Sequence, residues 1–90
     1  MATRTVHTYI TYKKEIGRGK AIISGTRTRV SNIVAYYKLG LSAEELAQEF
    51  PHLTLSHIYD ALSYYYEHRK EIDSEIDEES EENLKKLIRV

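Results

Sequence analysis

The side chains that could do chemistry in this chain are histidines, hydroxyls and carboxylates, and their spacing does not assemble a catalytic set. The histidines are His7, His52, His57 and His68, and no two of them share a helix face at the three- or four-residue spacing of metal ligands. No cysteine is present, so thiolate metal sites and disulfides are excluded. No serine or threonine has a histidine and an acid in a recognisable nucleophile arrangement. We therefore expect no enzyme, no metal and no cofactor.

Hydrogen-bonding side chains gather instead at the start of a predicted helix. Thr54 is a good N-cap for a helix over residues 55–71, and Ser42 with Glu45 forms a capping box for a helix over residues 43–50. Two short capped helices joined by three residues match a helix-turn-helix. In that motif the start of the second helix faces base edges in the major groove of DNA. The candidate base contacts are Thr54, Ser56 and His57.

The charge is divided unevenly along the 90 residues. Residues 1–40 carry eight basic and one acidic side chains, a net charge of +7, whereas the rest carry five basic and thirteen acidic ones, a net charge of −8. Because the second helix of the motif has no Lys or Arg before Arg69, phosphate neutralisation must come from the basic half. The alternative is that the two halves attract each other across a dimer. The candidate phosphate contacts are Lys13, Lys14, Arg18, Lys20, Arg27 and Arg29.

The remaining patterns predict a mainly α fold that begins with short strands. Residues 5–24 are expected to hold two strands, at 5–12 and 21–23, around a basic turn at 13–20 that contains Gly17 and Gly19. This turn lacks the full spacing of a nucleotide-binding loop. A further helix is expected over about residues 31–39, capped by Ser31 and stopped by Gly40.

The third helix is expected to run well past Arg69, because no glycine or proline interrupts it. Its apolar row alternates spacings of three and four, which is typical of a coiled-coil seam; a long amphipathic helix lying on its own domain is an equal alternative. The row is Leu55, Ile58, Leu62, Tyr65, Arg69, Ile72 and Ile76. The same periodicity predicts that Tyr65 and Tyr66 face the core and that Tyr64 is more exposed.

The composition changes after residue 72, so we divide the chain into a DNA-binding and dimerisation domain at 1–72 and a partner-binding tail at 73–90. Residues 73–82 are mostly acidic and are expected to be solvated and weakly ordered. A basic and apolar patch follows, which predicts folding on a partner; a frayed terminus is the alternative. The candidate partner contacts are Ile72, Ile76, Leu84, Lys85, Lys86, Leu87, Ile88 and Arg89.

Four segments resemble the "domain of unknown function 433" family: residues 23–30 (ISGTRTRV), 39–46 (LGLSAEEL), 50–58 (FPHLTLSHI) and 61–65 (ALSYY). The resemblance covers roughly residues 7–77. The chain departs from the family at Lys20-Ala21, where a proline is frequent, and at Thr28, where isoleucine is frequent.

This resemblance implies a homeodomain-like helix-turn-helix after the short strands, and a bacterial or archaeal origin. It also implies an antitoxin of the VapB type, which would bind its operator DNA as a homodimer and neutralise a ribonuclease toxin of the PIN-domain type through its C-terminal segment. The alternatives are a transcriptional regulator without a toxin and a protein-protein adaptor. No apolar run approaches the roughly 18 residues of a membrane span, and no signal peptide is evident, so we expect a cytoplasmic protein.

Overall fold

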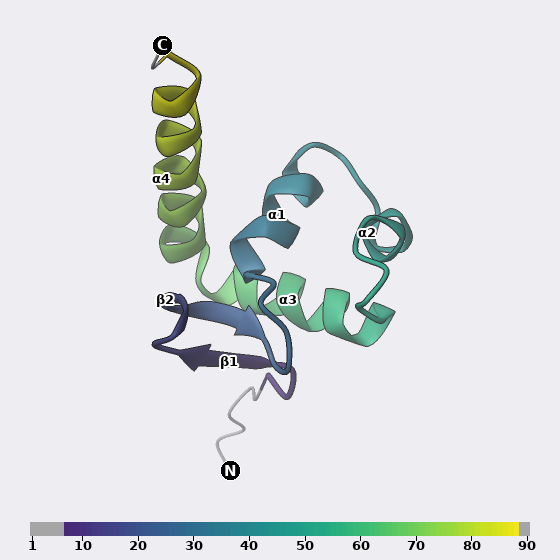
Figure 1. Cartoon of the computed structure of the whole chain (residues 1–90). Helices are drawn as coiled ribbons and strands as arrows, with labels where there is room; N and C mark the ends of the chain where they lie inside the picture. The colour runs from purple at the N-terminus through teal and green to yellow at the C-terminus, as the bar shows by residue number, and fades with distance from the viewer. Residues whose placement is uncertain (1–6, 89–90) are drawn as a thin grey trace.

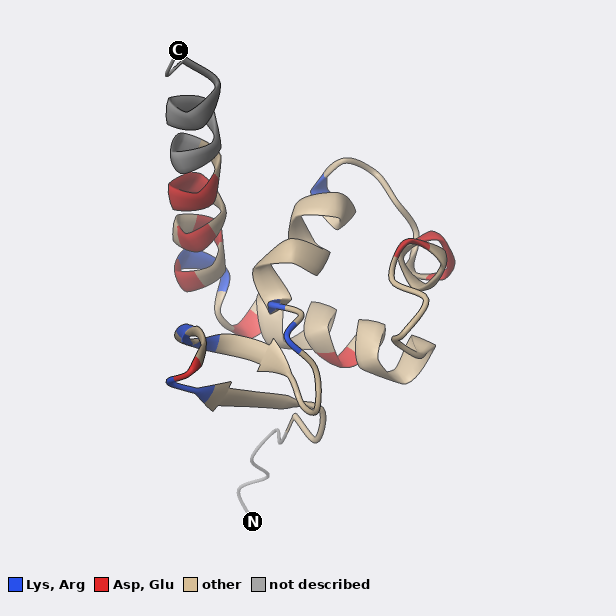
Figure 2. Ribbon diagram, viewed as in Figure 1, with Lys and Arg blue, Asp and Glu red and all other residues tan. Residues whose placement is uncertain are grey.

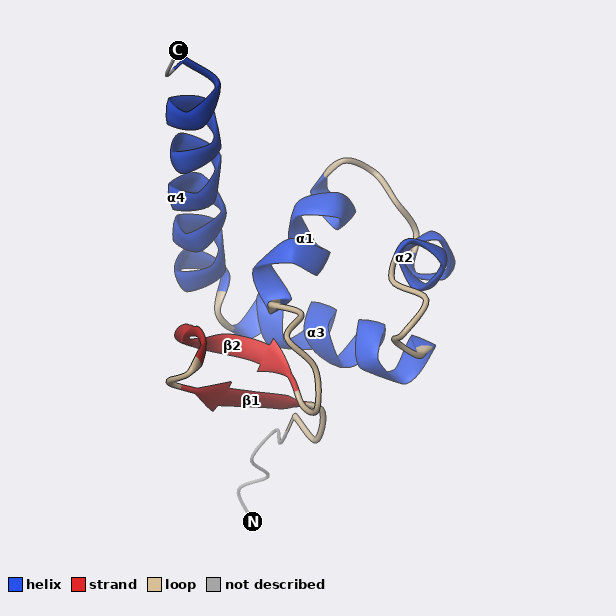
Figure 3. Cartoon of the chain, viewed as in Figure 1, coloured by secondary structure: helices blue, strands red, loops and turns tan. Residues whose placement is uncertain are grey.

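The computed structural model describes residues 7–88, with side chains for residues 7–80 (Figures 1 and 3). An N-terminal hairpin of two strands is followed by four helices, which confirms the predicted mainly α fold. No helix in this part of the chain combines the length and the apolar character needed to cross a membrane. The elements in chain order are β1 (Ile10–Lys13), β2 (Ile16–Ile23), α1 (Val30–Lys38), α2 (Ala43–Glu49), α3 (Leu55–Glu67) and α4 (Arg69–Ile88).

The hairpin differs from the prediction at its turn. Only two residues, at positions 14 and 15, separate the antiparallel strands, because Lys13 pairs with Ile16. The register then shifts, so that residues 17–20 bulge from β2 before Ala21 pairs with Tyr12. Two glycines make this bulge possible: Gly17, Arg18 and Gly19 have φ values of 64°, 57° and 79°. The basic segment predicted to be a turn is therefore mostly an irregular part of β2, and β1 begins only at Ile10.

Local capping signals are confirmed for α2 and α3. The Ser42 hydroxyl accepts from the backbone N–H of Glu45, whose carboxylate accepts in return from the Ser42 N–H. At α3, the Thr54 hydroxyl accepts from the His57 N–H at 3.2 Å, and the His57 ring accepts from the Thr54 N–H at 2.9 Å. Each reciprocal pair satisfies backbone donors that the first helical turn leaves free.

The predicted cap of α1 is wrong. This helix begins at Val30 with Arg29 as its N-cap residue, and no side chain caps it. Ser31 lies inside the first turn and is completely buried, and its hydroxyl donates to Glu79 of α4. An isolated bridge between Ile22 and Arg29 holds the entry to α1 against β2, which starts the helix earlier than the serine suggests.

The core forms where the hairpin and all four helices meet. This single cluster contains at least one buried residue from β2 and from each helix: Ile23, Ile33, Leu46, Ile58 and Ile72, in chain order. Because five elements contribute, the cluster holds the hairpin, the helix-turn-helix and the start of α4 in one unit.

The tyrosine prediction is reversed for two of the three residues. Tyr64 is 3% exposed and Tyr66 is 54% exposed, whereas Tyr65 is buried as expected. The rings of His7 and Tyr12, which are distant in sequence, and of His68, one helical turn later, pack against Tyr64. A helical wheel of α3 alone does not contain this information.

The C-terminal acidic segment is helical, which corrects the expectation of weak order. The helix α3 ends at Glu67, His68 departs from helical geometry with φ −131° and ψ 44°, and α4 then begins. The predicted continuous seam is therefore broken, and its first member, Leu55, is 42% exposed. Ile72 is completely buried and Ile76 packs against the core, which gives α4 the apolar anchor that its acidic composition hides. The predicted boundary between residues 72 and 73 falls inside α4.

Candidate nucleic-acid interface

The helix-turn-helix is held by two adjacent residues of its turn. Leu53 is buried in the core, and the Thr28 hydroxyl lies 2.7 Å from the His52 ring nitrogen Nε2. This hydrogen bond connects the turn before α3 to the loop that follows the hairpin. The cation Arg27 is the chain neighbour of Thr28 and therefore lies in the loop that contacts this turn.

The three predicted base contacts have different surroundings. Thr54 and His57 cap each other, and the His57 ring also packs edge-on against Tyr9 at 4.6 Å between centroids. Their main observed role is to hold the start of α3. Ser56 is exposed and lines a shallow cavity of about 370 Å³ together with Tyr9 and Tyr59. Ser56 is therefore the predicted contact most open to a ligand.

The carboxylate of Asp60 does not stand free on the exposed face of α3. One oxygen lies 2.9 Å from His7 Nδ1, and the other accepts from the Tyr9 N–H at 2.8 Å. The second ring nitrogen of His7, Nε2, lies 2.7 Å from the Glu67 carboxylate. Both ring nitrogens donate to carboxylates when the imidazole is protonated. Burial lowers the pKa of His7, but the hydrogen bonds to Glu67 and Asp60 outweigh it and raise the pKa above 6.5.

The predicted phosphate contacts fall into two groups. Lys13 and Arg27 line one cavity of about 260 Å³, together with Ile16, Ile22, Gly25 and Thr26. We call it the hairpin cavity. None of its lining residues is acidic. Lys14 is exposed in the adjoining turn. These three cations form no ion pair with any side chain that the structure describes, and they are open to a polyanion.

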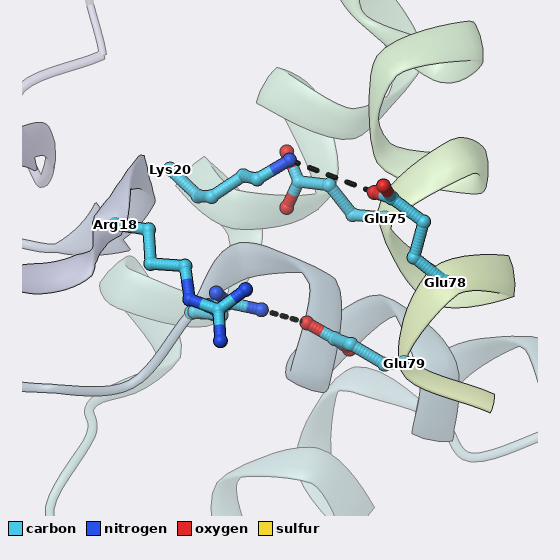
Figure 4. A pocket seen from close by; sticks show the side chains of 6 residues that line it. Arg18, Lys20, Glu75, Glu78 and Glu79 are labelled. Carbon is cyan, nitrogen blue, oxygen red and sulfur yellow. Dashed lines mark hydrogen bonds and ion pairs between the residues drawn. The ribbon is translucent and has the colours of Figure 1, made fainter. Parts of the chain in front are cut away.

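The second group faces α4 (Figure 4). Arg18, Lys20 and Arg29 line a cavity of about 160 Å³ whose other walls are carboxylates of α4. We call it the α4 cavity. The carboxylates are Glu75, Glu78 and Glu79. Figure 2 shows the same division across the molecule, with basic residues on the hairpin and acidic residues along α4.

Two of the three cations in the α4 cavity are already paired. Lys20 Nζ lies 3.6 Å from a Glu78 oxygen. Arg29 forms an ion pair with Glu79 and also donates to the Gly17 carbonyl at 3.2 Å. The attraction between basic and acidic halves that we expected as an alternative across a dimer thus occurs within one chain.

Glu75 is the functional candidate that sequence reasoning missed. Its side chain is 2% exposed, and neither carboxylate oxygen has a hydrogen-bond partner among the described residues. Burial raises its pKa, although Lys20 and Arg29 oppose this effect. The spacing of Ile72, Glu75, Ile76 and Glu79 places them on one helix face, which was the available signal. The acidic composition obscured it.

The predicted partner contacts fall into two groups, those buried in the core of this chain and those whose side chains the structure does not describe. Ile72 and Ile76 pack into this chain's own core and do not present a free apolar surface. The backbone at 84–88 belongs to α4, but the side chains of Leu84, Lys85, Lys86, Leu87 and Ile88 lie outside those that the structure describes. Arg89 lies outside the described residues altogether. Among residues 7–80, no group of three or more metal-ligating side chains could hold a metal ion.

The family described as "Protein of unknown function (DUF433)" matches residues 10–65, which span the hairpin and almost all of the first three helices. The chain belongs to the DUF433 family. A crystal structure of a DUF433 member from Anabaena variabilis is similar to it, with 33% sequence identity and a TM-score of 0.71. That similarity covers 77% of this chain and 68% of the Anabaena chain. No protein of curated function matches the sequence.

The two cavities of this DUF433 protein differ in how much of their lining lies inside the segment matched by the family. The hairpin cavity is built entirely from residues inside the matched segment. The carboxylates of the α4 cavity come after it. The cations thus belong to the family region, and their acidic partners come from the helix that follows.

Proposed function

We propose that this DUF433 protein binds operator DNA as a dimer and acts as an antitoxin of a type II toxin-antitoxin system. The observation that carries the DNA-binding half is the hairpin cavity, where Lys13 and Arg27 face solvent with no acidic residue in the lining. Phosphate groups would occupy this position, because cations without a carboxylate partner can neutralise them fully.

The helix-turn-helix would supply orientation more than affinity. The helix α3 contains no Lys or Arg, so its contribution to phosphate binding is small. Ser56 is exposed near the start of α3, where a recognition helix meets base edges. We therefore propose that the hairpin cations hold the backbone while Ser56 and its neighbours read the groove.

The toxin-binding half of the proposal concerns the distal part of α4. This helix extends away from the rest of the domain toward the C-terminus (Figure 1). The partner would be a PIN-type ribonuclease, as the resemblance implies, and both proteins would meet in the cytoplasm. Residues 84–89 would fill a groove on the toxin and direct Lys85, Lys86 or Arg89 at its acidic active site.

Salt-dependent binding to DNA from the upstream region of its own gene tests the first half. We expect Lys13→Gln/Arg27→Gln to weaken binding and to reduce the slope of log K against log salt by about 2, because two phosphate contacts are lost. Arg69→Gln/Lys70→Gln removes the same charge from exposed positions on α4 and serves as the matched control. Equal binding by both double variants would refute the role of the hairpin cavity.

A regulator without a toxin is the second candidate, and the burial of Ile72 and Ile76 in the chain's own core favours it. Co-purification with the neighbouring gene product separates the two. The full-length chain should bind and inhibit that product, whereas a version ending at Ser80 keeps the described packing of α4 and should not. Salt-dependent DNA binding without any complex would favour the regulator, and the absence of DNA binding would favour a protein-protein adaptor.

A further inference from the structure

The α4 cavity has the composition of a phosphate site that is occupied by carboxylates. Arg18, Lys20 and Arg29 come from the hairpin bulge and the start of α1, and side chains of α4 face them (Figure 4). Arg18 lies between two glycines in a bulge that projects from β2, and it makes no ion pair with a described residue. Three cations from two separate segments converge on one small volume, and only α4 supplies negative charge there.

Two of the three carboxylates are held against these cations weakly, whereas Glu79 pairs with Arg29 and accepts a hydrogen bond from the buried Ser31 hydroxyl. Lys20 and Glu78 are 37% and 67% exposed, and exposed ion pairs contribute little because water screens them. Glu75 is buried beside the same cations without a hydrogen bond, which is unfavourable for a charged group. Besides Glu79, the apolar side chains of Ile72, which is completely buried, and Ile76 attach α4 to the core. The acidic turn and the part of α4 that follows it can therefore move away from the hairpin when the contacts of Glu79 break, while the start of α4 stays anchored at Ile72.

We infer that Glu75, Glu78 and Glu79 compete with DNA phosphates for Arg18, Lys20 and Arg29, so that the acidic face of α4 lowers the affinity of this protein for DNA. This inference rests on the DNA binding proposed above. The hairpin cavity makes the first contacts, and the cations of the α4 cavity join only when the carboxylates move aside.

A consequence follows for any protein that binds α4. A partner that draws the acidic face away from the hairpin frees up to three cations for phosphate, and it therefore strengthens DNA binding. Because coupling between two binding sites is reciprocal, DNA strengthens the binding of that partner by the same factor.

The decisive variant is Glu75→Gln/Glu78→Gln/Glu79→Gln, compared with Glu44→Gln/Glu49→Gln/Asp77→Asn. Both remove three negative charges, but the control residues are exposed and do not line the α4 cavity. Fluorescence anisotropy with a 30-base-pair duplex would measure affinity between 50 and 200 mM salt. We expect the first variant to bind about tenfold or more tightly than the control, with a slope of log K against log salt steeper by about 2 to 3.

The outcomes separate this inference from the proposed function. Wild-type binding to DNA with equal affinities for the two variants overturns the inference alone. No binding by any of the three proteins overturns the proposed function and the inference together. If the first variant does not fold, as judged by circular dichroism, Glu78→Gln/Glu79→Gln replaces it and is expected to show a smaller increase in the same direction.

A second measurement follows the movement of α4 away from the hairpin, in a protein that keeps all the carboxylates of α4. The chain has no cysteine, so Glu15→Cys/Ser80→Cys carries two spin labels at exposed positions, one on the hairpin turn and one on α4. We expect the distance distribution to broaden and lengthen when the duplex binds. A distribution that does not change in saturating duplex overturns the inference.

Discussion

The hairpin of this DUF433 protein borders two cationic cavities that differ in one respect. Lys13 and Arg27 line the hairpin cavity without a carboxylate, whereas Arg18, Lys20 and Arg29 share the α4 cavity with three glutamates. Both groups come from the same basic half of the chain. The difference shows that local sequence places the cations, but the docking of a distant helix decides which of them are free.

The largest expected change in stability comes from removing Ile72, the buried side chain that holds the carboxylates of α4 at only one of the two cavities. Ile72→Ala should lower the free energy of unfolding by about 2 to 5 kcal/mol, because a completely buried side chain leaves a cavity in the core. Urea denaturation measures the change. Ser80→Ala, at an exposed position on the same helix, is the control and should change stability by less than about 0.5 kcal/mol. Equal effects would show that α4 is not anchored through Ile72.

His7 connects the segment that precedes β1 to α3. Its contribution to the free energy of unfolding should change with pH in a predictable direction. The pKa of His7 is raised in the folded state, so its contribution is fully present below its ordinary value of 6.5 and is lost as the pH rises through the folded pKa. We expect His7→Ala to cost about 1 to 2 kcal/mol at pH 6, where charge-assisted hydrogen bonds to Asp60 and Glu67 form. Denaturation at pH 9 should show a much smaller loss.

His57→Gln is a suitable control for the pH experiment, since it alters a histidine that has no carboxylate partner among the described residues. A cost of His7→Ala that is the same at pH 6 and pH 9 would contradict the ionic role of His7.

Removing the buried charge of Glu75 in the α4 cavity should change the free energy of unfolding by less than the two preceding substitutions, and it should raise it instead of lowering it. Glu75→Gln is expected to raise the free energy of unfolding at pH 7 by up to about 1 kcal/mol, because it removes a buried charge without a hydrogen bond. Burial raises the pKa of Glu75 above 4.5, so its contribution to stability is present below that value and is lost as the pH rises through the folded pKa.

The advantage of the Glu75→Gln variant over the wild type should therefore grow from pH 4 to pH 7, and urea denaturation at both values measures it. Glu44→Gln, at an exposed position on α2, is the control. A destabilised Glu75→Gln protein at pH 7 would mean that Lys20 and Arg29 stabilise the carboxylate by more than its burial costs.

The smallest expected effect concerns the exposed ion pair of the same cavity. Lys20→Gln should change the free energy of unfolding by less than about 0.5 kcal/mol, because Lys20 and Glu78 are partly exposed and 3.6 Å apart. Thermal denaturation of Lys20→Gln, of Glu78→Gln and of the double variant measures the coupling between them. A coupling above about 1 kcal/mol would show that the ion pair itself holds the acidic turn.

Local signals predicted local structure well in this chain. The capping box at Ser42 and the N-cap at Thr54 form as expected, because each depends on residues three positions apart; the return contact from the His57 ring to Thr54 was not predicted. Predictions about exposure failed where a distant element covers the residue. Ser31 is buried because α4 packs over it, and Tyr64 is buried because His7 and Tyr12 reach it from the N-terminal segment. The sequence identified the six candidate phosphate contacts but did not predict which of them face carboxylates of α4 and which do not.

The sequence by itself determined the helices α2 and α3, the uneven charge and the family of this protein, because these depend on short-range spacing, composition and recognisable segments. Only the tertiary structure decided that the acidic segment folds back on the basic one. One buried isoleucine, Ile72, brings Glu75, Glu78 and Glu79 to the hairpin from more than 50 residues away, where they face Arg18 and Lys20. Contacts between residues so far apart depend on how whole elements pack, and no pattern within either segment specifies that packing.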